Sequence, residues 1–568
     1  MTRRSLLLTL VLTALIPLTA VLYRRIQAGA SLAGLFPSQS HPQAGTMAPQ
    51  PPAPPAAAVI VVGAGLAGLS AAHAALRLGC PVRLLERAPK PGGNSIKASS
   101  GINGAPTRFQ PGYPDRPDTT FYADTVRSAG GRLSSPPAGA GAARAEREAL
   151  ISILTGRSAA AVEDFLAGEI GVDLSVVAQL GGHSAARTHR GAGKTPPGAA
   201  IVSALLEKLK ADSRFGLELG AEVTHLLTAE SESGAGQRPA AVTGVEYTTT
   251  SSGGDSSDSG SKETTTHRLL GPVVFATGGF AGDTHGQLAH YRADLAGLPS
   301  TNDARPGTHG LLRRDAAAAL VDMDSVQVHP TGFVDPADPR ARVKFLAAEM
   351  LRGEGGILLS GGRRFVNEME TREHVSGVVM ALPTADDDDG AGGGAAGEDE
   401  LRQWDVQLLL DPGACEAAAA HVGFYLWKGL ITKKKVRELD ETTRQTIREY
   451  ADVVQGKKED EFGRKVFGHW SLKGTAEDDD QEVCVGRVTP ITHFTMGGVV
   501  MNEKAQVMAS DLGSSDPRPI DGLWAAGEVT GGIHGDNRLG GSSLLECVVY
   551  GRIAGEQASR RLIELKTE

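Results

Sequence analysis

The pattern of apolar and polar positions predicts buried strands that alternate with helices. Residues 59–62 form a continuous apolar run rich in β-branched side chains, which is typical of a strand covered on both faces of a parallel sheet. A helical pattern follows over residues 69–78, and a second strand pattern covers residues 82–86. Further strand patterns lie at residues 221–227, 271–276 and 523–526. This alternation favours an α/β fold.

A glycine-rich turn connects the first strand to the first helix. Gly63, Gly65 and Gly68 have the spacing GxGxxG, and Glu86 ends the second strand 18 residues after Gly68. Glycines here let the backbone approach a pyrophosphate at the helix N-terminus, and an acid at this distance accepts a hydrogen bond from a ribose hydroxyl. The glycine spacing alone is a weak signal. In the order strand, turn, helix, strand and acid, it predicts a Rossmann-like dinucleotide-binding domain.

Other stretches predict further helices and loops. Helical patterns cover residues 146–156 and 159–169, and a last helix runs from Ser542 through Ala554. Stretches rich in small or acidic residues predict loops at 131–144, 231–262, 386–400 and 477–481. The stretch 231–262 is rich in serine, glycine and aspartate, so we expect a disordered hairpin insertion there.

The N-terminus carries an apolar run over residues 6–23 with an arginine pair on each side. Its 18 residues are at the lower limit for a membrane-spanning helix and long for the apolar region of a signal peptide. A Pro/Ala-rich stretch at residues 41–58 separates it from the first strand, which argues against a buried helix. We expect a targeting segment or a single membrane anchor. The lack of an amphipathic pattern favours the secretory pathway or endoplasmic reticulum over the mitochondrion.

Composition and charge narrow the function. A chain of 568 residues has room for two or three domains. The net charge of −9 provides no basic surface, so we expect no nucleic-acid partner. No cysteine pair has metal-ligand spacing and no CxxCH haem motif is present, so we expect no metal, no haem domain and free or core thiols. The four cysteines are Cys80, Cys415, Cys484 and Cys547.

The C-terminal part of the chain combines basic side chains with two Gly-Gly turns. His493 precedes the turn at residues 497–498, and Arg538 precedes the turn at residues 540–541. Between the two turns, a short buried strand is followed by Glu528. A bidentate arginine and exposed backbone N–H groups both recognise carboxylates. The pattern therefore predicts a site for an anionic substrate.

Together and in this order, these segments resemble the flavoprotein family of fumarate reductases and succinate dehydrogenases. The resemblance extends from Val59 to the C-terminus outside the insertions, and its ending, Gly-Gly-Ser-Ser-Leu-Leu-Glu-Cys, is similar to that of the soluble eukaryotic, flavocytochrome c flavoprotein-like fumarate reductases. It implies an α/β fold in which a Rossmann-like FAD-binding domain contains an inserted α+β capping domain. The expected parts are a targeting segment and linker (1–58), the FAD-binding domain (59–330 and 491–568) and the capping domain (331–490).

The resemblance implies FAD as the cofactor. Membrane-bound succinate dehydrogenases of the family bond FAD covalently through a histidine where this chain has Asn94, so the FAD is expected to be non-covalent. The last helix is expected to aim its N-terminus at the flavin pyrimidine, where its partial positive charge stabilises reduced flavin. The expected cofactor-binding residues are Gly63, Gly65, Gly68, Glu86, Asn94, Ser95, Gly101, Val223, Gly278, Glu528, Ser543 and Leu544.

The resemblance also implies reduction of fumarate to succinate. Reduced FAD is expected to deliver a hydride from N5 to one alkene carbon, and Arg372 a proton to the other. A guanidinium holds its proton tightly, so it needs rapid reprotonation; Glu349 and Arg352 match the family's relay positions. The residues expected to bind the substrate carboxylates are His329, His493, Arg538 and Gly541.

Two positions depart from the family pattern. Ala348 stands where some bacterial members use a threonine on a substrate carboxylate, and His309 replaces an aspartate at the flavin end of the site. His183 lies in a loop similar to one of the soluble eukaryotic enzymes, and we expect it either near the flavin or at the surface.

Other functions stay open at this point. An FAD-dependent oxidoreductase acting on another enoate or dicarboxylate, such as an L-aspartate oxidase, shares much of the motif set. A flavin-binding protein without turnover is the alternative from another class, although it would be expected to have lost a catalytic position. Arg372 and Arg538 argue against a steroid dehydrogenase, whose site would be apolar. No motif identifies the electron donor, for which reduced flavin and NADH are the candidates.

Overall fold

The computed structural model describes most of the chain from residue 57 onward. The described residues are 57–134, 141–193, 195–229, 241–251, 263–303, 305–347, 350–351, 354–384, 401–510 and 518–567. The predicted N-terminal segment at 6–23, the acidic insertion at 386–400, and Ala348, Glu349 and Arg352 lie outside them. No helix among the described residues combines the length and the apolar sequence needed to cross a bilayer.

A parallel sheet carries the predicted glycine turn. Its strand order is β20-β21-β10-β1-β2-β6, and all neighbours are parallel except β20 and β21. The strands are β1 (Val59–Val62), β2 (Val82–Glu86), β6 (Phe215–Leu219), β10 (Val273–Phe275), β20 (Gln506–Met508) and β21 (Pro519–Ala525). The predictions at 59–62, 82–86, 271–276 and 523–526 are confirmed. Because β1 lies between β10 and β2, the turn after β1 emerges in the middle of the sheet's carboxyl edge.

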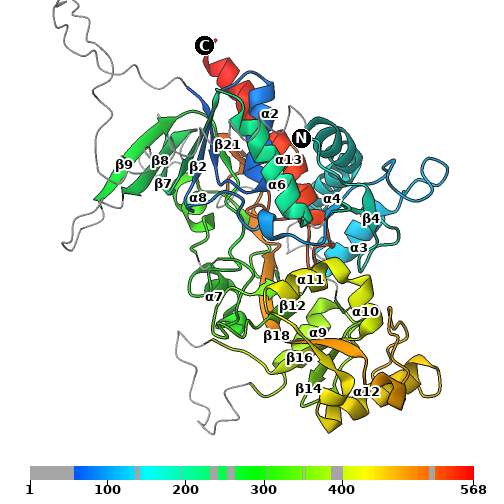
Figure 1. The fold of residues 1–568 in the computed structure, drawn as a ribbon. Coiled ribbons are helices and arrows are strands. Elements are labelled where there is room, and N and C mark those ends of the chain that lie inside the picture. Colours follow the sequence, from blue (N-terminus) through cyan, green and yellow to red (C-terminus); the bar gives the residue numbers. More distant parts are fainter. Residues whose placement is uncertain are drawn as a thin grey trace, which may run out of the picture. The chain divides into compact units, whose positions relative to one another are not determined.

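Alternate residues of β1 enter two different cores, which explains its unbroken apolar sequence. Val59 and Val61 pack among helices on one face of the sheet, whereas Ile60 and Val62 pack on the other face. Figure 1 shows the helices of the first face lying together. They are α2 (Leu66–Arg77), α6 (Pro197–Lys210) and α13 (Ser542–Leu565). The last helix is therefore longer than predicted and ends at Leu565 rather than Ala554.

A three-stranded antiparallel sheet and α8 (His309–Ala316) cover the second face. The strands are β7 (Ala221–Thr228), β8 (Val242–Ser251) and β9 (Glu263–Leu270). The prediction of a disordered insertion over 231–262 is wrong for residues 242–251. Val242, Val245 and Tyr247 are buried against the parallel sheet, and the threonines between and after them favour a strand. The other residues of that stretch lie outside the described ones, except Ala241.

A seven-stranded antiparallel sheet forms the centre of the predicted capping domain. Its order is β13-β12-β18-β16-β14-β15, and β17 also pairs with β18. The strands are β12 (Val326–Phe333), β13 (Phe345–Leu346), β14 (Ile357–Ser360), β15 (Arg363–Arg364), β16 (Val406–Leu410), β17 (Thr432–Lys435) and β18 (Glu482–Thr495). Figure 1 shows this sheet with its helices, which are α9 (Arg372–Met380), α10 (Pro412–Ala417), α11 (Ala419–Trp427) and α12 (Glu441–Val454).

The two predicted domain boundaries fall inside the paired strands β12 and β18. His329 pairs with Ile491 and Gly332 with Thr489, so the pairing shifts by one residue between these points. Each strand has a proline at the shift, Pro330 and Pro490, and a proline cannot donate to the ladder. The boundaries at 330/331 and 490/491 stay a prediction, but the pairing irregularity lies at both of them.

The remaining elements bring further corrections. The loop predicted at 131–144 is wrong at both ends, because α3 (Phe121–Ser134) and α4 (Gly141–Gly156) extend into it. The acidic loop at 477–481 contains a buried turn residue, Asp478. The predicted helix at 159–169 is helical, as α5 (Ser158–Ala160) and η2 (Ala161–Glu169). All four cysteines are free, as expected. The other short elements are η1 (Ser95–Lys97), β3 (Ile102–Asn103), β4 (Val176–Ala178), β5 (Thr188–Arg190), α7 (Gln287–Tyr291), η3 (Ala293–Leu295), β11 (Leu320–Val321), η5 (Val436–Glu438), η6 (Ala476–Asp478) and β19 (Gly498–Val499).

Candidate active site

The turn after β1 is so tight that only glycine fits at its first and last positions. Gly63 has a φ of 104°, and a Cβ added to it would lie 2.4 Å from the carbonyl oxygen of Ala276. A Cβ on Gly68 would lie 1.9 Å from the carbonyl oxygen of Gly63. Helix α2 therefore begins directly against the ends of β1 and β10. Gly65 has no side chain to cap this helix, and the N–H of Leu66 donates to the hydroxyl of Ser95 at 3.2 Å. Gly65, Leu66 and Ala67 line the pocket, so the start of the helix borders the place that a phosphate would occupy.

Glu86 closes the glycine turn from the end of β2. Its Oε2 accepts a hydrogen bond from the N–H of Ala64 at 2.8 Å, and its Oε1 accepts one from the N–H of Ala88 at 2.7 Å. A carboxylate has about four acceptor positions, so these two bonds leave capacity for a ribose hydroxyl. Glu86 lines the pocket, in agreement with its expected place.

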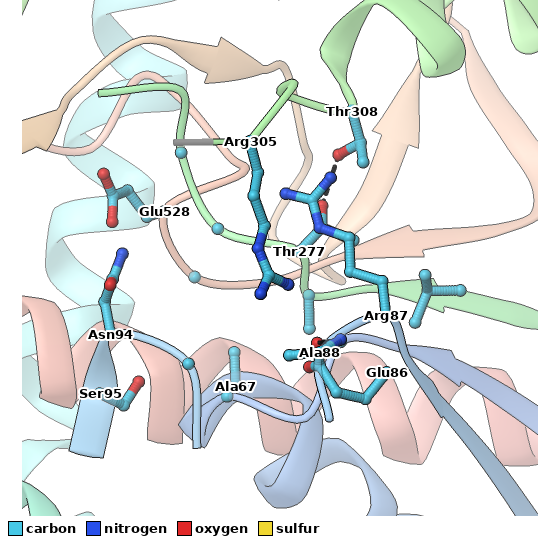
Figure 2. A pocket seen from close by; sticks show the side chains of 18 of the residues that line it. Ala67, Glu86, Arg87, Ala88, Asn94, Ser95, Thr277, Arg305, Thr308 and Glu528 are labelled. Atoms are coloured by element: carbon cyan, nitrogen blue, oxygen red, sulfur yellow. Dashed lines mark hydrogen bonds between the residues drawn. The ribbon is translucent and has the colours of Figure 1, made fainter. Parts of the chain in front are cut away.

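A long pocket follows the carboxyl edge of the parallel sheet. Figure 2 shows Glu528 and Asn94 at one end, Glu86 and Arg87 at the other, and Arg305 between them. The expected cofactor residues that line it are Gly63, Gly65, Glu86, Asn94, Ser95, Val223, Gly278 and Glu528. An extended groove with a glycine turn in its wall and a ribose acceptor at one end fits FAD. Arg87 and Arg305 were missed by sequence reasoning, because neither belongs to the glycine motif.

Four expected cofactor residues are not part of the pocket wall. Gly68 packs α2 against the turn, and Gly101 packs against the backbone of His189. Ser543 and Leu544 lie in the first turn of α13, where Leu544 is buried in the core. Their direct contact with FAD stays a prediction.

Glu528 connects this pocket to the second part of the site. Its Oε1 accepts hydrogen bonds from the N–H of Thr495 at 3.0 Å and from the hydroxyl of Thr495 at 3.3 Å. Burial raises the pKa of Glu528 to about 7, although the two bonds from Thr495 act in the opposite direction. Thr495 ends β18 two residues after His493, so the strand leads from the pocket to the predicted substrate residues.

Arg538 and His493 are in direct contact. The Nη2 of Arg538 donates to Oε1 of Gln327 at 3.0 Å and lies 3.2 Å from Nε2 of His493. Because a guanidinium only donates, Nε2 accepts and the proton of the neutral ring is on Nδ1, which lies 3.3 Å from the hydroxyl of Thr301. Burial, and then the charges of Arg538 and Arg372, hold the pKa of His493 well below its usual value. His493 is therefore a neutral hydrogen-bonding group.

His329 lies beside His493 on the neighbouring strand. Their ring centroids are 5.8 Å apart, with the rings nearly perpendicular. The Nδ1 of His329 accepts from the N–H of Thr331 at 3.3 Å, so its proton in the neutral ring is on Nε2. Gln327, two residues earlier, lies on the same face of β12 and contacts Arg538. Sequence reasoning missed Gln327, although its spacing from His329 is the signal that would have found it.

Arg372 extends toward the same cluster from helix α9. It is the first residue of α9, whose N-cap Thr371 accepts from the N–H of His374 at 3.2 Å and so fixes the start of the helix. Its Nη2 lies 4.0 Å from the position of a Cβ on Gly540. Its charge also acts on the pKa of His493. The structure thus brings five predicted residues together: His329, Arg372, His493, Arg538 and Gly541.

The expected proton relay is not placed by the structure. Glu349 and Arg352 lie outside the described residues, as does Ala348. The neighbouring residues Phe345 and Leu346 form β13, and residues 350–351 form a turn, so no described residue between 345 and 351 is helical. The roles of Arg372, Glu349 and Arg352 therefore stay predictions.

The Gly540-Gly541 turn depends on Asn103, which sequence reasoning missed. Gly541 has a φ of 78°, and a Cβ on it would lie 2.3 Å from Oδ1 of Asn103. The side-chain amide of Asn103 donates to the carbonyl of Gly540 at 2.7 Å, and its backbone N–H donates to the carbonyl of Gly541 at 3.1 Å. The signal for Asn103 is its place in the stretch of mostly small residues from Ala98 to Gly104.

His309, one of the two departures, is a core residue. It is fully buried, its Nε2 donates to the carbonyl of Val529 at 3.1 Å, and its ring packs edge-on against Phe280. Burial lowers its pKa to about 4, so the ring is neutral. The pocket wall at this point is formed by its neighbour Thr308 instead.

Comparison with known proteins agrees with this geometry. A family model, described as FAD binding domain, matches residues 58–544. Fumarate reductase of Schizosaccharomyces pombe is 39% identical over 521 residues, which cover 89% of this chain and 90% of that protein. Fumarate reductase 1 of Saccharomyces cerevisiae is 39% identical over 511 residues, covering 88% and 97%. The solved structure of the open conformation of a flavocytochrome c3 fumarate reductase has a TM-score of 0.66 and 28% identity, covering 89% of this chain and 78% of that one. The chain therefore is an FAD-dependent oxidoreductase that belongs to the flavoprotein family of fumarate reductases and succinate dehydrogenases, with soluble eukaryotic fumarate reductases among its relatives.

Proposed function

We propose that this protein reduces fumarate to succinate. The observation that carries the proposal is the buried cluster of His329, His493 and Arg538, with Arg372 beside it, at the Glu528 end of the FAD pocket. Such a cluster offers several hydrogen-bond donors and two guanidinium charges to an anion. The relatives named fumarate reductase, which match along nearly the whole chain, support the same substrate.

The cluster is suited to bind a dicarboxylate and to polarise it. Arg538 is held by Gln327 and His493, so its guanidinium is oriented before a ligand arrives. His493 and His329 are in contact, and the low pKa of His493 keeps that ring neutral. Donors that are already oriented stabilise charge that develops on a carboxylate during reduction.

Arg372 is the proposed proton donor. FAD, when bound, supplies the hydride from N5. Arg372 stands at the start of α9, near the Gly540-Gly541 turn. Because a guanidinium parts with its proton reluctantly, we infer that Glu349 and Arg352 return a proton to it after each turnover.

A steady-state assay tests the proposed function. The purified holoenzyme is supplied with reduced viologen, NADH or reduced flavin mononucleotide in turn, and fumarate-dependent oxidation of each is followed. We expect succinate as the product, and the preferred donor identifies the electron source. Acrylate as an alternative electron acceptor and L-aspartate as an alternative electron donor serve as further substrates, because they separate a fumarate reductase from an enoate reductase and from an L-aspartate oxidase. Absence of turnover with all three substrates, with FAD bound, would leave only a flavin-binding role.

We further propose that FAD is bound without a covalent link. Asn94 lines the pocket, and its side-chain amide donates to Oδ1 of Asn302 at 2.5 Å. An asparagine cannot form the histidine linkage of the succinate dehydrogenases. Acid precipitation of the holoenzyme should therefore release yellow flavin into the supernatant, and flavin that stays on the protein pellet would contradict the proposal.

We propose that residues 6–23 direct the chain to the secretory pathway or endoplasmic reticulum, or to the mitochondrion, either as a cleaved segment or as a membrane anchor. The support is the apolar run between two arginine pairs. A fluorescent fusion of residues 1–58 tests this. Diffuse cytosolic fluorescence would contradict it.

A further inference from the structure

A buried ionic network lies behind the Gly540-Gly541 turn. Arg187 is completely buried, and its Nε donates to Oδ2 of Asp118 at 2.6 Å, while its Nη1 donates to Oδ2 of Asp124 at 2.6 Å. The hydroxyl of Thr120 accepts from Nη2 at 2.7 Å, and the N–H of Ser184 donates to Asp124 at 2.7 Å. Two carboxylates thus hold one guanidinium in a single orientation.

His183 connects this network to the turn. Its Nε2 lies 3.0 Å from the carbonyl oxygen of Gly540, and its Nδ1 lies 3.5 Å from Nη1 of Arg187. A carbonyl only accepts and a guanidinium only donates, so the ring carries its proton on Nε2 and donates it to Gly540. The surface alternative for His183 is wrong, because the side chain is buried. His183 is not part of the pocket wall, and its closeness to the flavin stays a prediction.

The Gly540 carbonyl therefore has two fixed donors, His183 at 3.0 Å and the side chain of Asn103 at 2.7 Å. A trans peptide is planar, and its N–H points opposite to its C=O. The N–H of Gly541 must then point away from His183 and Asn103. Arg372 borders the same turn, with Nη2 4.0 Å from the Cβ position of Gly540. In the described part of the chain, the N–H of Gly541 donates to no protein oxygen.

We propose that His183, held by Arg187, is a positioning residue that fixes the Gly540–Gly541 peptide so that the N–H of Gly541 is a donor to a substrate carboxylate. The inference rests on the proposed function and deepens it. Two glycines in succession have little conformational preference of their own, and Gly541 has a positive φ. Without an external donor on its carbonyl, this peptide would have other orientations available at low cost.

The contribution of His183 does not change with pH in the working range. Burial and the charge of Arg187 lower its pKa to about 4, although Asp124, Asp118 and the bond to Gly540 act in the opposite direction. The ring is therefore in the same neutral tautomer from about pH 5.5 upward. A catalytic acid or base at this position would instead give a pH-dependent effect.

Two substitutions of His183 separate positioning from packing. His183→Gln retains a donor at about the place of Nε2, whereas His183→Leu removes it at similar volume. We expect His183→Leu to raise both the KM for fumarate and the succinate dissociation constant about tenfold, with kcat within about twofold, because the lost donor binds substrate and transition state alike. His183→Gln should restore both constants to within about twofold. The ratio of the variant KM to the wild-type KM should be constant from pH 6 to pH 8.

His189→Leu is the matched control. His189 is also buried in this region, with Nε2 2.7 Å from the hydroxyl of Thr107 and Nδ1 2.8 Å from the carbonyl of Arg187, but it does not contact Gly540. The His189→Leu variant should lower the melting temperature as much as His183→Leu does, and it should leave the KM for fumarate unchanged. The succinate constants are measured by isothermal titration of the oxidised holoenzyme, which needs no turnover.

The outcomes keep the two proposals apart. A wild-type enzyme that does not reduce fumarate refutes the proposed function. A wild-type enzyme that reduces fumarate, together with a His183→Leu variant of unchanged KM and succinate affinity, overturns the positioning role. A His183→Gln variant as impaired as His183→Leu, or a His189→Leu variant with an equally raised KM, overturns it as well, because packing would then explain the loss.

Discussion

The FAD pocket and the substrate cluster are neighbours, yet they are built in opposite ways. The centre of the pocket is backbone, from turns that directly follow strands of the parallel sheet, and Glu86 is the main side chain that supports it. The cluster consists of side chains from β12, β18, α9 and the loop before α13. A backbone site needs glycines close together in the sequence, whereas a side-chain site needs strands from distant segments to pair.

Burial acts in the same sense on the ionisable groups of the two regions. The acid at the end of the pocket, Glu528, has a raised pKa, and the histidine in the cluster, His493, has a lowered one. Burial is the largest cause in both cases, and it favours the neutral form of each group. The positive charge of the cluster therefore lies on the guanidinium groups of Arg372 and Arg538.

The largest effect is expected from Arg372→Ala. This substitution tests whether proton transfer depends on the substrate cluster and not on the FAD pocket. Loss of the proton donor should lower kcat for fumarate reduction at least a thousandfold, while FAD occupancy is unchanged, because Arg372 is not part of the pocket wall. Arg372→Lys should keep a trace of activity, since an ammonium can donate a proton from a different geometry. Near-normal turnover of Arg372→Ala with FAD bound would show that Arg372 is not the proton donor.

Gly68→Ala tests the glycine turn of the FAD pocket instead of the substrate cluster. The new Cβ would lie 1.9 Å from the carbonyl oxygen of Gly63, so α2 must shift, at a cost of more than about 3 kcal/mol. We expect loss of FAD, measured by flavin fluorescence, and a lower melting temperature. Gly423→Ala in α11 is the control, because nothing lies within 4 Å of its Cβ position; it should be neutral or stabilising. Full FAD affinity in Gly68→Ala would show that the turn tolerates a side chain.

Glu528→Gln tests, in the apoprotein, whether the pKa of the acid at the end of the pocket is raised. The pKa of Glu528 is about 7 in the fold against 4.5 as the reference, so stability falls as the pH rises from 4.5 to 7 and stays low above 7. That difference of 2.5 units corresponds to about 3 kcal/mol. Glutamine keeps the acceptor for Thr495 but cannot ionise. Urea unfolding should therefore find the variant more stable than wild type at pH 8 and similar at pH 5; an equal difference at both pH values would contradict the raised pKa.

Arg538→Ala should have the smallest of these effects. It removes a charged partner of the carboxylate, so the KM for fumarate should rise and kcat/KM should fall about thirtyfold, with FAD bound as before. Arg538→Lys should restore part of the affinity, because it returns the charge without the planar fork. Arg268→Ala, an exposed arginine paired with Glu246 on β8, is the control and should change neither constant. An unchanged KM for Arg538→Ala would show that Arg538 does not bind a substrate carboxylate.

The sequence predicts the backbone region well and the side-chain region only through family resemblance. Strands β1 and β2 are predicted residue by residue, because burial on both faces leaves no polar position in β1 and the glycines mark its end. The roles of Gln327 and Asn103 were not predicted, because their partners, Arg538 and Gly540, are distant in the sequence. Strand β8 was missed because its threonines and glycine resemble those of the neighbouring polar insertion.

The pairing of β12 with β18 has a consequence for modular engineering. Phe333 of β12 and Val488 of β18 lie just inside the predicted capping domain of residues 331–490, and these two residues are directly opposite each other. Opposite residues of an antiparallel pair are about 5 Å apart, so a two-residue hairpin would reconnect them. Excision of residues 334–487 would then delete Arg372 and retain the glycine turn, His329 and His493. Phe280, Met323 and Val326 share one hydrophobic core with residues of the excised segment, so the folding of such a chain would measure how far the flavin-binding part is independent of that segment.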